Sequence, residues 1–331
     1  MEKDVYKAFV VREKDGQFNA NIETKKTADL PQGDLLIKVS YSSLNYKDAL
    51  SASGNKGVTR SYPHTPGIDA VGTVQTSDSN AFKPGDKLIV TSYDLGMNTH
   101  GGFAEYIRVP AHWAVRLPQD MTMKEAMIIG TAGLTAGMSV QRLAALVNPE
   151  HGDVIVSGAT GGVGAHSVAI LNKLGYSVVA LTGKENEKDY LKNLGAKRII
   201  LRKDFEVSEK RPLLKPAFAG GIDTVGGSIL DNMIKSTQPM GAVACCGNAA
   251  SAQLNLTVFP FILRGVALIG IDSQNYPMHQ RQKVWNKLAC DWKPEALMNN
   301  YDEIKLEQVP EKLDLMLKGQ LKGRTIVNLA G

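Results

Sequence analysis

The chain has 331 residues, of which 43% are hydrophobic and 21% are charged, and it carries a formal net charge of +5. This is an ordinary globular composition, and at roughly 150 residues per domain the length predicts two domains. The mild, mixed charge lacks the concentrated basic stripe of a nucleic-acid-binding protein, so we expect no nucleic-acid partner. No run of about 18 apolar residues is present, so we also expect no membrane-spanning segment.

The cysteines exclude a disulfide framework. There are three, Cys245, Cys246 and Cys290, and the first two are neighbours at the end of an apolar strand, which is typical of core residues. No Cys-x-x-Cys pair suggests a zinc site. The segment Met1–Lys7 is charged and lacks the apolar region of a signal peptide. We therefore expect a cytoplasmic protein in a reducing compartment.

The first 124 residues predict a β-rich region. Short apolar runs are separated by turn signals such as those at 31–34 and 83–86. Many short strands at this spacing indicate a barrel or a sandwich. The expected strands are Lys7–Val11, Leu35–Val39, Ala70–Val74, Lys87–Val90, Ala104–Val109 and Ala114–Leu117.

From residue 124 the pattern changes. Lys124–Leu146 has the spacing of a helix that ends before Asn148-Pro149. Strands and helices then alternate, which indicates a parallel, doubly wound α/β sheet. The expected strands are Val154–Val156, Val178–Leu181, Arg198–Leu201, Ile222–Val225, Ala242–Cys245 and Val266–Ile271, and the expected helices among them are Gly164–Leu174 and Asn186–Leu194.

After Ser273 the chain returns to other structure. Helices are expected at His279–Cys290, Glu295–Asn300 and Pro310–Leu317, and a strand at Arg324–Leu329. The alternating region is thus flanked on both sides. We therefore expect an inserted cofactor domain at 125–271, with 1–124 and 272–331 as the first and second parts of a second domain.

A glycine-rich turn follows the expected strand Val154–Val156 and opens the helix after it. Its glycines fall at positions 158, 161 and 164. Such glycines allow a tight turn, a close approach of backbone to a diphosphate and close helix–strand packing. The helix N-terminus then offers free N–H groups to the anion. A tight turn without a ligand can show the same glycines, but the strand before and the helix after them favour a dinucleotide site.

The end of the second strand indicates which dinucleotide is bound. NAD sites usually place Asp or Glu there, whereas this chain has Thr182-Gly183-Lys184. A hydroxyl, a bare backbone and an ammonium suit a 2′-phosphate, which a carboxylate would repel. Arg202, after the third strand, can supply a second cation. We therefore expect NADPH as the cofactor, although Glu185 is adjacent; the alternative is that both cations are ordinary solvated charges.

Seven segments along essentially the whole chain are typical of one superfamily. They are Ser43–Asp48, Pro66–Gly72, Gly101–Tyr106, Gly130–Ala136, Asp223–Gly227, Pro260–Val266 and Gly323–Thr325. They resemble the medium-chain dehydrogenase/reductases, and most closely the YhdH/YhfP-type quinone oxidoreductases, a branch that includes acryloyl-CoA reductases. The resemblance implies a GroES-like β-barrel catalytic domain and a Rossmann coenzyme domain, with NADPH in the cleft between them.

The resemblance also implies residue roles. Tyr46 would border the nicotinamide end of the cofactor. The pyrophosphate and the 2′-phosphate side would be held by Thr160, Gly161, Gly162 and Val163 and by Thr182, Gly183, Lys184 and Arg202. Asn248, Ile262 and Ser273 would line the nicotinamide half, and these three come from the resemblance alone.

Zinc is expected to be absent. Zinc-dependent members of the superfamily carry Gly-His-Glu where this chain has Gly67-Ile68-Asp69, and they have a cysteine or an equivalent ligand near Asn45. Their structural zinc is held by four close cysteines, whereas residues 1–244 contain none. We therefore expect no metal site and no Lewis-acid route to alcohol oxidation.

Without a metal, hydride addition to an activated C=C bond or a quinone is the favoured chemistry. Such a reaction develops negative charge on an oxygen, which a hydrogen-bond donor stabilises. Tyr46 is the first candidate for positioning or for proton supply, with Asn45 and Asp48 assisting. Solvent as the proton source stays open, as do a covering role for Tyr46 and a helix-capping role for Asp48.

Three other features are weaker candidates. We expect His64 to shape its loop and His100 to be a solvent-facing turn residue. In the basic loop 53–60, Lys56 and Arg60 either contact the phosphates of a CoA thioester or face water.

The sequence therefore predicts an NADPH-dependent reductase of small activated alkenes, with acryloyl-CoA as the first candidate substrate. An NADPH:quinone oxidoreductase is the alternative, and a non-catalytic NADPH-binding or RNA-binding relative is a remote one. A homodimer is expected, because the strand Val266–Ile271 would lie at the edge of the sheet, where it can pair with a second copy.

Overall fold

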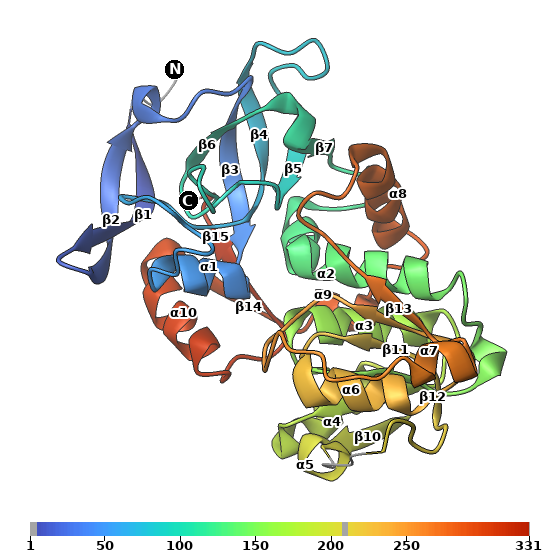
Figure 1. Ribbon diagram of the computed structural model, residues 1–331. Coiled ribbons are helices and arrows are strands. Elements are labelled where there is room, and N and C mark those ends of the chain that lie inside the picture. The colour runs from blue at the N-terminus through green and yellow to red at the C-terminus, as the bar shows by residue number, and fades with distance from the viewer. Residues whose placement is uncertain (1–4, 207–210, 331) are drawn as a thin grey trace. The chain divides into compact units, whose positions relative to one another are not determined.

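The computed structural model describes residues 5–206 and 211–330. The chain divides into two compact units (Figure 1). Unit 1 comprises Met1–Thr131, Gln274–Ala289 and Asn300–Gly331, and unit 2 comprises Ala132–Ser273 and Cys290–Asn299. Most of the charged N-terminal segment lies outside the described residues. Among the residues that are described, no helix combines the length and apolarity needed to cross a membrane.

Unit 1 is built on a seven-stranded sheet and a separate two-stranded hairpin. The sheet has the order β14-β15-β3-β4-β5-β7, with β6 also paired to β3, and the hairpin pairs β1 with β2. The elements are β1 (Val5–Lys14), β2 (Gln17–Lys26), β3 (Leu35–Ser43), α1 (Tyr46–Ala52), β4 (Asp69–Ser77), β5 (Lys87–Thr91), β6 (Tyr106–Val109), β7 (Ala114–Arg116), α8 (Met278–Ala289), β14 (Tyr301–Lys305), α10 (Val309–Leu317) and β15 (Arg324–Asn328).

Apolar side chains at every second position of the strands form the core of unit 1. Leu35, Ile37 and Val39 of β3 point to one side and are fully buried, as are Leu88 and Val90 of β5. A period of two places every second side chain on the same face, and that face packs on α1 and α10. The first and last parts of the chain therefore share one core.

Unit 2 is a six-stranded parallel sheet with the order β10-β9-β8-β11-β12-β13. This order confirms the predicted doubly wound fold. Its elements are β8 (Val154–Val156), α3 (Gly162–Lys173), β9 (Val178–Thr182), α4 (Lys188–Asn193), β10 (Arg198–Leu201), α5 (Arg202–Phe205), β11 (Phe218–Asp223), α6 (Gly227–Lys235), β12 (Thr237–Cys245), α7 (Phe259–Arg264), β13 (Ala267–Gly270) and α9 (Glu295–Met298).

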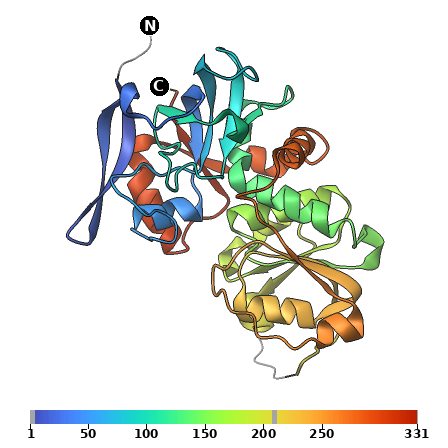
Figure 2. The same cartoon turned by 45° about the horizontal axis from the view of Figure 1, so that its top comes forward.

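Helices cover both faces of the unit 2 sheet. The strand order runs outward in opposite directions from β8 and β11. Because the connections between parallel strands are right-handed, α3 lies on one face of the sheet and α6 on the other. The strands lie between the yellow-green helix α3 and the golden helix α6, which are labelled in Figure 1 and seen again in Figure 2. The loops that follow the strands therefore gather along the carboxyl edge of the sheet, where nucleotides bind in such folds.

The long helix α2 (Met123–Leu143) is interrupted at Gly130, which has φ 51° and ψ −159°. The sequence predicts one continuous helix here, so the interruption is a correction. The division between the two units falls directly after Thr131. The expected domain bounds, 1–124, 125–271 and 272–331, stay a prediction.

Two strands were missed by the sequence pattern. In β2, Phe18, Ala20 and Ile22 alternate with polar residues, and the strand is only partly buried. The other, β14, has one buried residue, Ile304. Each strand contains too few apolar residues to be recognised as an apolar run in the sequence.

Candidate functional site

The glycine turn of unit 2 lies between β8 and α3. Gly158 has φ +57°, the left-handed conformation that favours glycine. A Cβ on Gly164 would lie 2.3 Å from the carbonyl oxygen of Gly158, so only glycine allows α3 to approach the turn this closely. Gly161 is the N-cap of α3 and has an ordinary φ of −80°. The turn leaves the first N–H groups of α3 without helical acceptors, which suits an anion.

A buried carboxylate holds the neighbouring strand end against this turn. The Ser157 hydroxyl donates to Asp223 Oδ1 at 2.7 Å, and the Thr224 N–H donates to Ser157 Oγ at 2.9 Å. The Gly226 N–H donates to Asp223 Oδ2 at 2.8 Å. Burial raises the pKa of Asp223, and these donors oppose that shift. The loops after β8 and β11 are therefore tied together through one side chain.

The end of β9 meets the start of α5. A Cβ on Gly183 would lie 2.4 Å from Nη2 of Arg202, so the guanidinium packs on the bare Cα. The Lys184 N–H donates to Thr182 Oγ1 at 3.0 Å. Glu185, the adjacent acid, pairs with Lys188 at 3.1 Å and Lys203 at 3.6 Å. Thr182, Gly183, Lys184 and Arg202 are called the cationic corner below, and their role in binding a cofactor stays a prediction.

The three residues placed by resemblance alone do not all lie at the same edge of the sheet. Asn248 follows β12 and is close to Gly226, because a Cβ on that glycine would lie 3.3 Å from the Asn248 Cα. Ser273 follows β13 and therefore also belongs to the carboxyl edge. Ile262 does not: α7 precedes β13, its C-cap Gly265 lies against Met240 near the start of β12, and Ile262 is 67% exposed. The structure does not bring Ile262 to the strand ends that carry the other expected residues.

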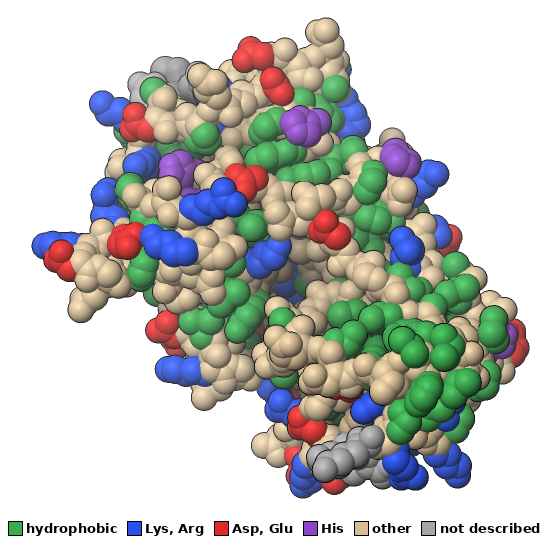
Figure 3. All heavy atoms as spheres, in the orientation of Figure 1, with side chains coloured by type: hydrophobic (Ala, Val, Ile, Leu, Met, Phe, Trp, Pro, Cys, Tyr) green, Lys and Arg blue, Asp and Glu red, His purple; other side chains and the backbone are tan. Residues whose placement is uncertain are grey.

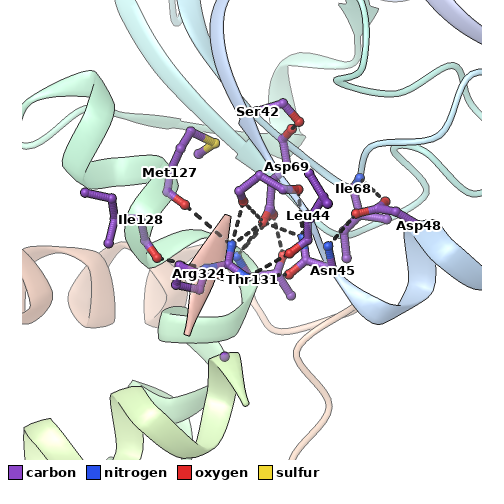
Figure 4. A network of polar contacts seen from close by, with 12 residues as sticks. Ser42, Leu44, Asn45, Asp48, Ile68, Asp69, Met127, Ile128, Thr131 and Arg324 are labelled. Carbon is purple, nitrogen blue, oxygen red and sulfur yellow. Dashed lines mark hydrogen bonds and ion pairs between the residues drawn. The ribbon is translucent and has the colours of Figure 1, made fainter. Parts of the chain in front are cut away.

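In unit 1, polar groups converge on the buried carboxylate of Asp69 (Figure 4). Ser43 Oγ donates to Asp69 Oδ2 at 2.7 Å, and Asn45 Nδ2 donates to the same oxygen at 2.8 Å. The hydroxyl of Thr131 donates to Oδ1 at 2.6 Å. Arg324 Nη2 lies 3.7 Å from Oδ2. Strands β3, β4 and β15 and the interruption in α2 therefore meet at one ion pair.

Asn45, Tyr46 and Asp48 lie together at the start of α1, but only one of them is accessible. Asn45 is 8% exposed, and Asp48, at 0%, accepts the N–H groups of Asn45 (2.8 Å), Gly67 (3.1 Å) and Ile68 (2.9 Å). Asn45 and Asp48 form a capping box for α1. Tyr46 is 48% exposed, and its hydroxyl has no hydrogen-bond partner among the described residues. Tyr46 is therefore the group of the three that can contact a ligand.

The carboxylates of this cluster influence each other. Burial and the neighbouring Asp69 carboxylate raise the pKa of Asp48 to about 7, while its three backbone donors oppose the shift. Burial lowers the pKa of Arg324, and Asp69 and Asp48 oppose that change. Two buried carboxylates thus share one buried guanidinium, and the raised pKa of Asp48 follows from its burial beside Asp69.

The sequence pattern gave no role to Ser43, Thr131 or Arg324, which complete this cluster. All three lie in the segments that carry the family resemblance, and this is the one signal that could have found them. Arg324 is separated from Ser43 by 281 residues. Spacing along the chain could not have placed them together.

The two basic residues of loop 53–60, Lys56 and Arg60, have defined contacts. Lys56 pairs with Glu13 at 2.6 Å and lies over the rings of Phe18 and Tyr62, at 5.4 and 4.8 Å from their centroids. Its side chain is 50% exposed and so faces water, and a phosphate would have to compete with these contacts. The backbone N–H of Arg60 donates to Asn98 Oδ1 at 3.2 Å.

The two histidines of unit 1 lie side by side, with ring centroids 5.7 Å apart. His64 is buried and exchanges two backbone hydrogen bonds with Val11, as expected of a residue that shapes its loop. His100 is half-buried, so the expectation of a solvent-facing residue is wrong. It packs against the His64 ring instead of pointing into water.

The cysteine pair of unit 2 lies beside Asp223. Cys246 Sγ donates to the Asp223 carbonyl at 3.3 Å, and Cys245 Sγ lies 3.9 Å from the carboxylate. Burial and that carboxylate raise the pKa of both thiols, that of Cys246 to about 12. These thiols therefore stay protonated and are poor nucleophiles.

Two protein-family models match the chain. "Alcohol dehydrogenase GroES-like domain" matches residues 31–119, within unit 1. "Zinc-binding dehydrogenase" matches residues 162–289, most of which lie in unit 2. The first match confirms the predicted GroES-like region.

The second family name implies zinc, and the residues present do not fit it. Asn45 is an amide and Ile68 is apolar, and neither is a usual zinc ligand. The Asp69 carboxylate is already engaged by Ser43, Asn45, Thr131 and Arg324. Across residues 5–206 and 211–330, no group of three or more His, Cys, Asp or Glu side chains could hold a metal ion.

Relatives match along nearly the full length. The putative quinone oxidoreductase YhfP of Bacillus subtilis is 45% identical, over 94% of this chain and 95% of its own. Its crystal structure with NAD bound has a TM-score of 0.96 and covers 98% of this chain and 100% of that chain. The probable acrylyl-CoA reductase AcuI of Escherichia coli is 42% identical, over 97% of this chain and 99% of its own.

A third relative was crystallised with the phosphorylated cofactor. The yhdH oxidoreductase of Salmonella enterica, in complex with NADP, is 41% identical and has a TM-score of 0.95, covering 97% of this chain and 99% of that chain. Sequence identities of 41% to 45% over nearly whole chains show membership of one family and not only a shared fold. The chain belongs to the medium-chain dehydrogenase/reductase superfamily, in the family that includes YhfP, YhdH and AcuI.

Proposed function

We propose that this protein is an NADPH-dependent, zinc-independent reductase of activated C=C bonds, with unit 2 as the coenzyme domain and unit 1 as the catalytic domain. The observation that carries the proposal is the acid-free cationic corner at the end of β9, beside a glycine turn that opens α3. That combination suits a diphosphate and a 2′-phosphate on one edge of the sheet.

The glycine turn would hold the diphosphate. Thr160, Gly161, Gly162 and Val163 form the end of the turn and the start of α3, where backbone N–H groups are free to donate. Gly161 and Gly162 present no Cβ, so the anion can approach the backbone closely. The positive end of the helix dipole adds to this attraction.

The cationic corner would select the phosphorylated ribose. Arg202 has no acidic partner among the described residues, and Glu185 is occupied by Lys188 and Lys203. A guanidinium and an ammonium bind a phosphate through charge-assisted hydrogen bonds. The yhdH relative was crystallised with NADP, whereas YhfP was crystallised with NAD, so the choice of cofactor has to be measured for this chain.

NADPH, when bound, supplies a hydride to the substrate. The chain then has to stabilise negative charge on a substrate oxygen and deliver a proton to the adjacent carbon. Tyr46 is suited to the first task because its hydroxyl is accessible and unengaged within the described residues. Asn45 and Asp48 are buried and fully hydrogen bonded, so we assign them to holding Tyr46 in place. The proton comes from the Tyr46 hydroxyl or from water.

Acryloyl-CoA, reduced to propionyl-CoA, is the substrate that we propose first. The AcuI relatives from Escherichia coli and Ruegeria pomeroyi carry that activity in their names, at 42% and 40% identity. The alternative is a quinone, which the name of YhfP favours. Both reactions need a hydride acceptor conjugated to a carbonyl oxygen, so the same hydroxyl donor would serve either.

The proposal is tested by a substrate comparison. Purified protein is mixed with NADPH and, in separate assays, with acryloyl-CoA, a simple enone and benzoquinone, and the decrease in NADPH absorbance is followed. Fast turnover of acryloyl-CoA supports the proposal. Turnover of benzoquinone alone supports the alternative, and an absence of NADPH binding in a titration refutes both.

We also propose that a second copy of this chain docks on unit 2. Strand β13 lies at an open edge of the sheet, and next to it apolar side chains gather over α7 and the start of β12 (Figure 3). Met240 is 75% exposed, and Val258, Ile262 and Leu263 each expose more than half of their surface. An open strand edge can pair with its own symmetry mate, and the adjacent apolar surface would then be buried.

Light scattering at micromolar concentration tests this dimer. Wild-type protein is expected to be dimeric and Leu263→Asp monomeric, because the charge would be buried in the contact. Leu146→Asp, which alters another exposed leucine of unit 2, is the control and should stay dimeric. A monomeric wild type would refute the docking surface.

A further inference from the structure

The ion pair of Asp69 and Arg324 hydrogen bonds to the backbone on both sides of the interruption in α2. The Ile128 carbonyl, among the last before Gly130, accepts a hydrogen bond from Arg324 Nε at 2.9 Å. The first N–H after the interruption, that of Thr131, donates to both oxygens of Asp69 at 3.1 and 2.9 Å. Carbonyl ends of helices favour cations and N–H ends favour anions, so the pair matches the polarity of each half of α2.

The same two side chains also hold the chain that leads into α1. Asp69 accepts the amide of Asn45, and Arg324 donates to the Leu44 carbonyl at 2.9 Å and to Asn45 Oδ1 at 3.3 Å. Asn45 is the N-cap residue, and Tyr46 begins the helix. The backbone that presents Tyr46 is therefore fixed by the pair that closes the interrupted helix.

The cluster packs against Gly130 so closely that it leaves no room for a side chain there. A Cβ on Gly130 would lie 2.5 Å from Asp69 Oδ2, 2.7 Å from Arg324 Nη2 and 2.7 Å from Ser43 Oγ. Arg324 is 3% exposed and Asp69 is 0% exposed. Because each buried charge needs the other, the two side chains stay paired.

We propose that Arg324 and Asp69 are positioning residues: together they set the place of Tyr46 relative to Thr131 and the interruption in α2. The proposal rests on the proposed function, in which Tyr46 contacts the substrate. Neither member of the pair is exposed enough to reach a ligand. They act through the side chain of Asn45, through the Leu44 carbonyl and through the two ends of the broken helix.

Arg324→Lys and Asp69→Asn test the proposal by kinetics. Arg324→Lys keeps the charge but loses the planar fork that reaches several acceptors, and Asp69→Asn removes acceptors from Asn45 or Thr131. Misplacement of a catalytic group costs up to about 10²-fold in rate, so kcat should fall by roughly 10- to 100-fold. The affinity for NADPH should be unchanged, because the glycine turn and the cationic corner belong to unit 2.

Amide hydrogen exchange supplies a measurement that needs no activity. The Thr131 N–H should exchange faster in both variants, because its acceptor has moved or lost charge. Arg264→Lys is the matched control. Arg264 also donates to three carbonyls, those of Leu214, Lys235 and Thr237, but within unit 2. It should alter neither kcat nor the exchange of Thr131.

The outcomes separate the two proposals. A fall in kcat together with faster Thr131 exchange supports positioning, and unchanged values of both in folded variants overturn it. If Arg324→Lys does not fold, Asp69→Asn decides alone. If wild-type protein reduces no substrate with NADPH, the proposed function fails, and the exchange of Thr131 alone then decides whether the pair positions this segment.

Discussion

The guanidinium of Arg202 rests on the Cα of Gly183, at a place where any Cβ would lie 2.4 Å from Nη2. The strand end therefore carries no side chain at the place where the guanidinium lies. This contact joins two loops of unit 2 that are separate in the sequence.

Arg202→Gln should weaken NADPH binding while leaving NADH binding nearly unchanged. The variant loses a charge-assisted hydrogen bond of about 1.5–3 kcal/mol, which corresponds to roughly 10- to 100-fold in the dissociation constant. Fluorescence titration with both cofactors measures it. Lys192→Gln is the control, because Lys192 is an exposed lysine of unit 2 that pairs with Asp189 instead. An equal loss for NADPH and NADH would show that Arg202 does not contact the 2′-phosphate.

Gly164→Ala and Gly161→Ala should differ. The first places a Cβ 2.3 Å from the Gly158 carbonyl oxygen, and overpacking of this kind costs about 1–3 kcal/mol of unfolding free energy. The second meets nothing closer than 3.3 Å and should fold normally. It should still weaken NADPH, because its methyl group would stand between the backbone and the diphosphate. Denaturant unfolding and cofactor titration separate these effects; full affinity in Gly161→Ala would contradict the close approach.

Tyr46→Phe should lower kcat and leave NADPH affinity intact. The ring stays, so any cover of the cofactor is kept, while the hydroxyl that we propose to stabilise the developing charge is lost. Loss of one such donor costs about 10²–10³-fold in other enzymes. Steady-state kinetics with acryloyl-CoA gives the answer. Unchanged turnover would remove the hydroxyl from the chemistry and leave Tyr46 with a covering role.

His64 should make the protein acid-sensitive. Burial lowers the pKa of His64 to about 4 from an ordinary value of 6.5. A lowered histidine pKa means that the unfolded chain binds the proton more tightly, so stability falls as the pH drops below 6.5. The loss between pH 7 and pH 4 is about 3 kcal/mol.

The comparison of wild type with His64→Gln isolates this contribution. The variant should lose less unfolding free energy than wild type between the two pH values, as measured by urea denaturation. His112→Gln, at an exposed histidine of unit 1, is the control and should follow wild type. Parallel pH profiles for wild type and His64→Gln would contradict the assignment.

The local features of unit 2 were predictable because their causes are local. Gly158 and Gly164 are needed for a turn within a few residues of themselves, and Thr182 to Lys184 directly follow their strand. Buried strands such as Val154–Val156 also show themselves as apolar runs. The local features on which the proposed nucleotide site depends were therefore visible in the sequence, and their role in binding stays a prediction.

The cluster in unit 1 was not visible, because it depends on contacts between distant segments. The helical spacing of Ala, Met and Leu continues through Gly130, and only the tertiary contacts of Asp69 and Arg324 show why the helix breaks there. His100 looked like a surface residue because it precedes two glycines. Its ring packs on His64, a partner that spacing along the chain does not identify.

The tether through Asp223 has a consequence for cofactor exchange. Ser157 and Thr224 link the turn after β8 to the turn after β11 through hydrogen bonds within the chain. A nucleotide thus meets a binding loop that is already in shape, so association wastes little free energy on ordering it. A loop braced in this way should bind each incoming coenzyme without first having to fold, cycle after cycle.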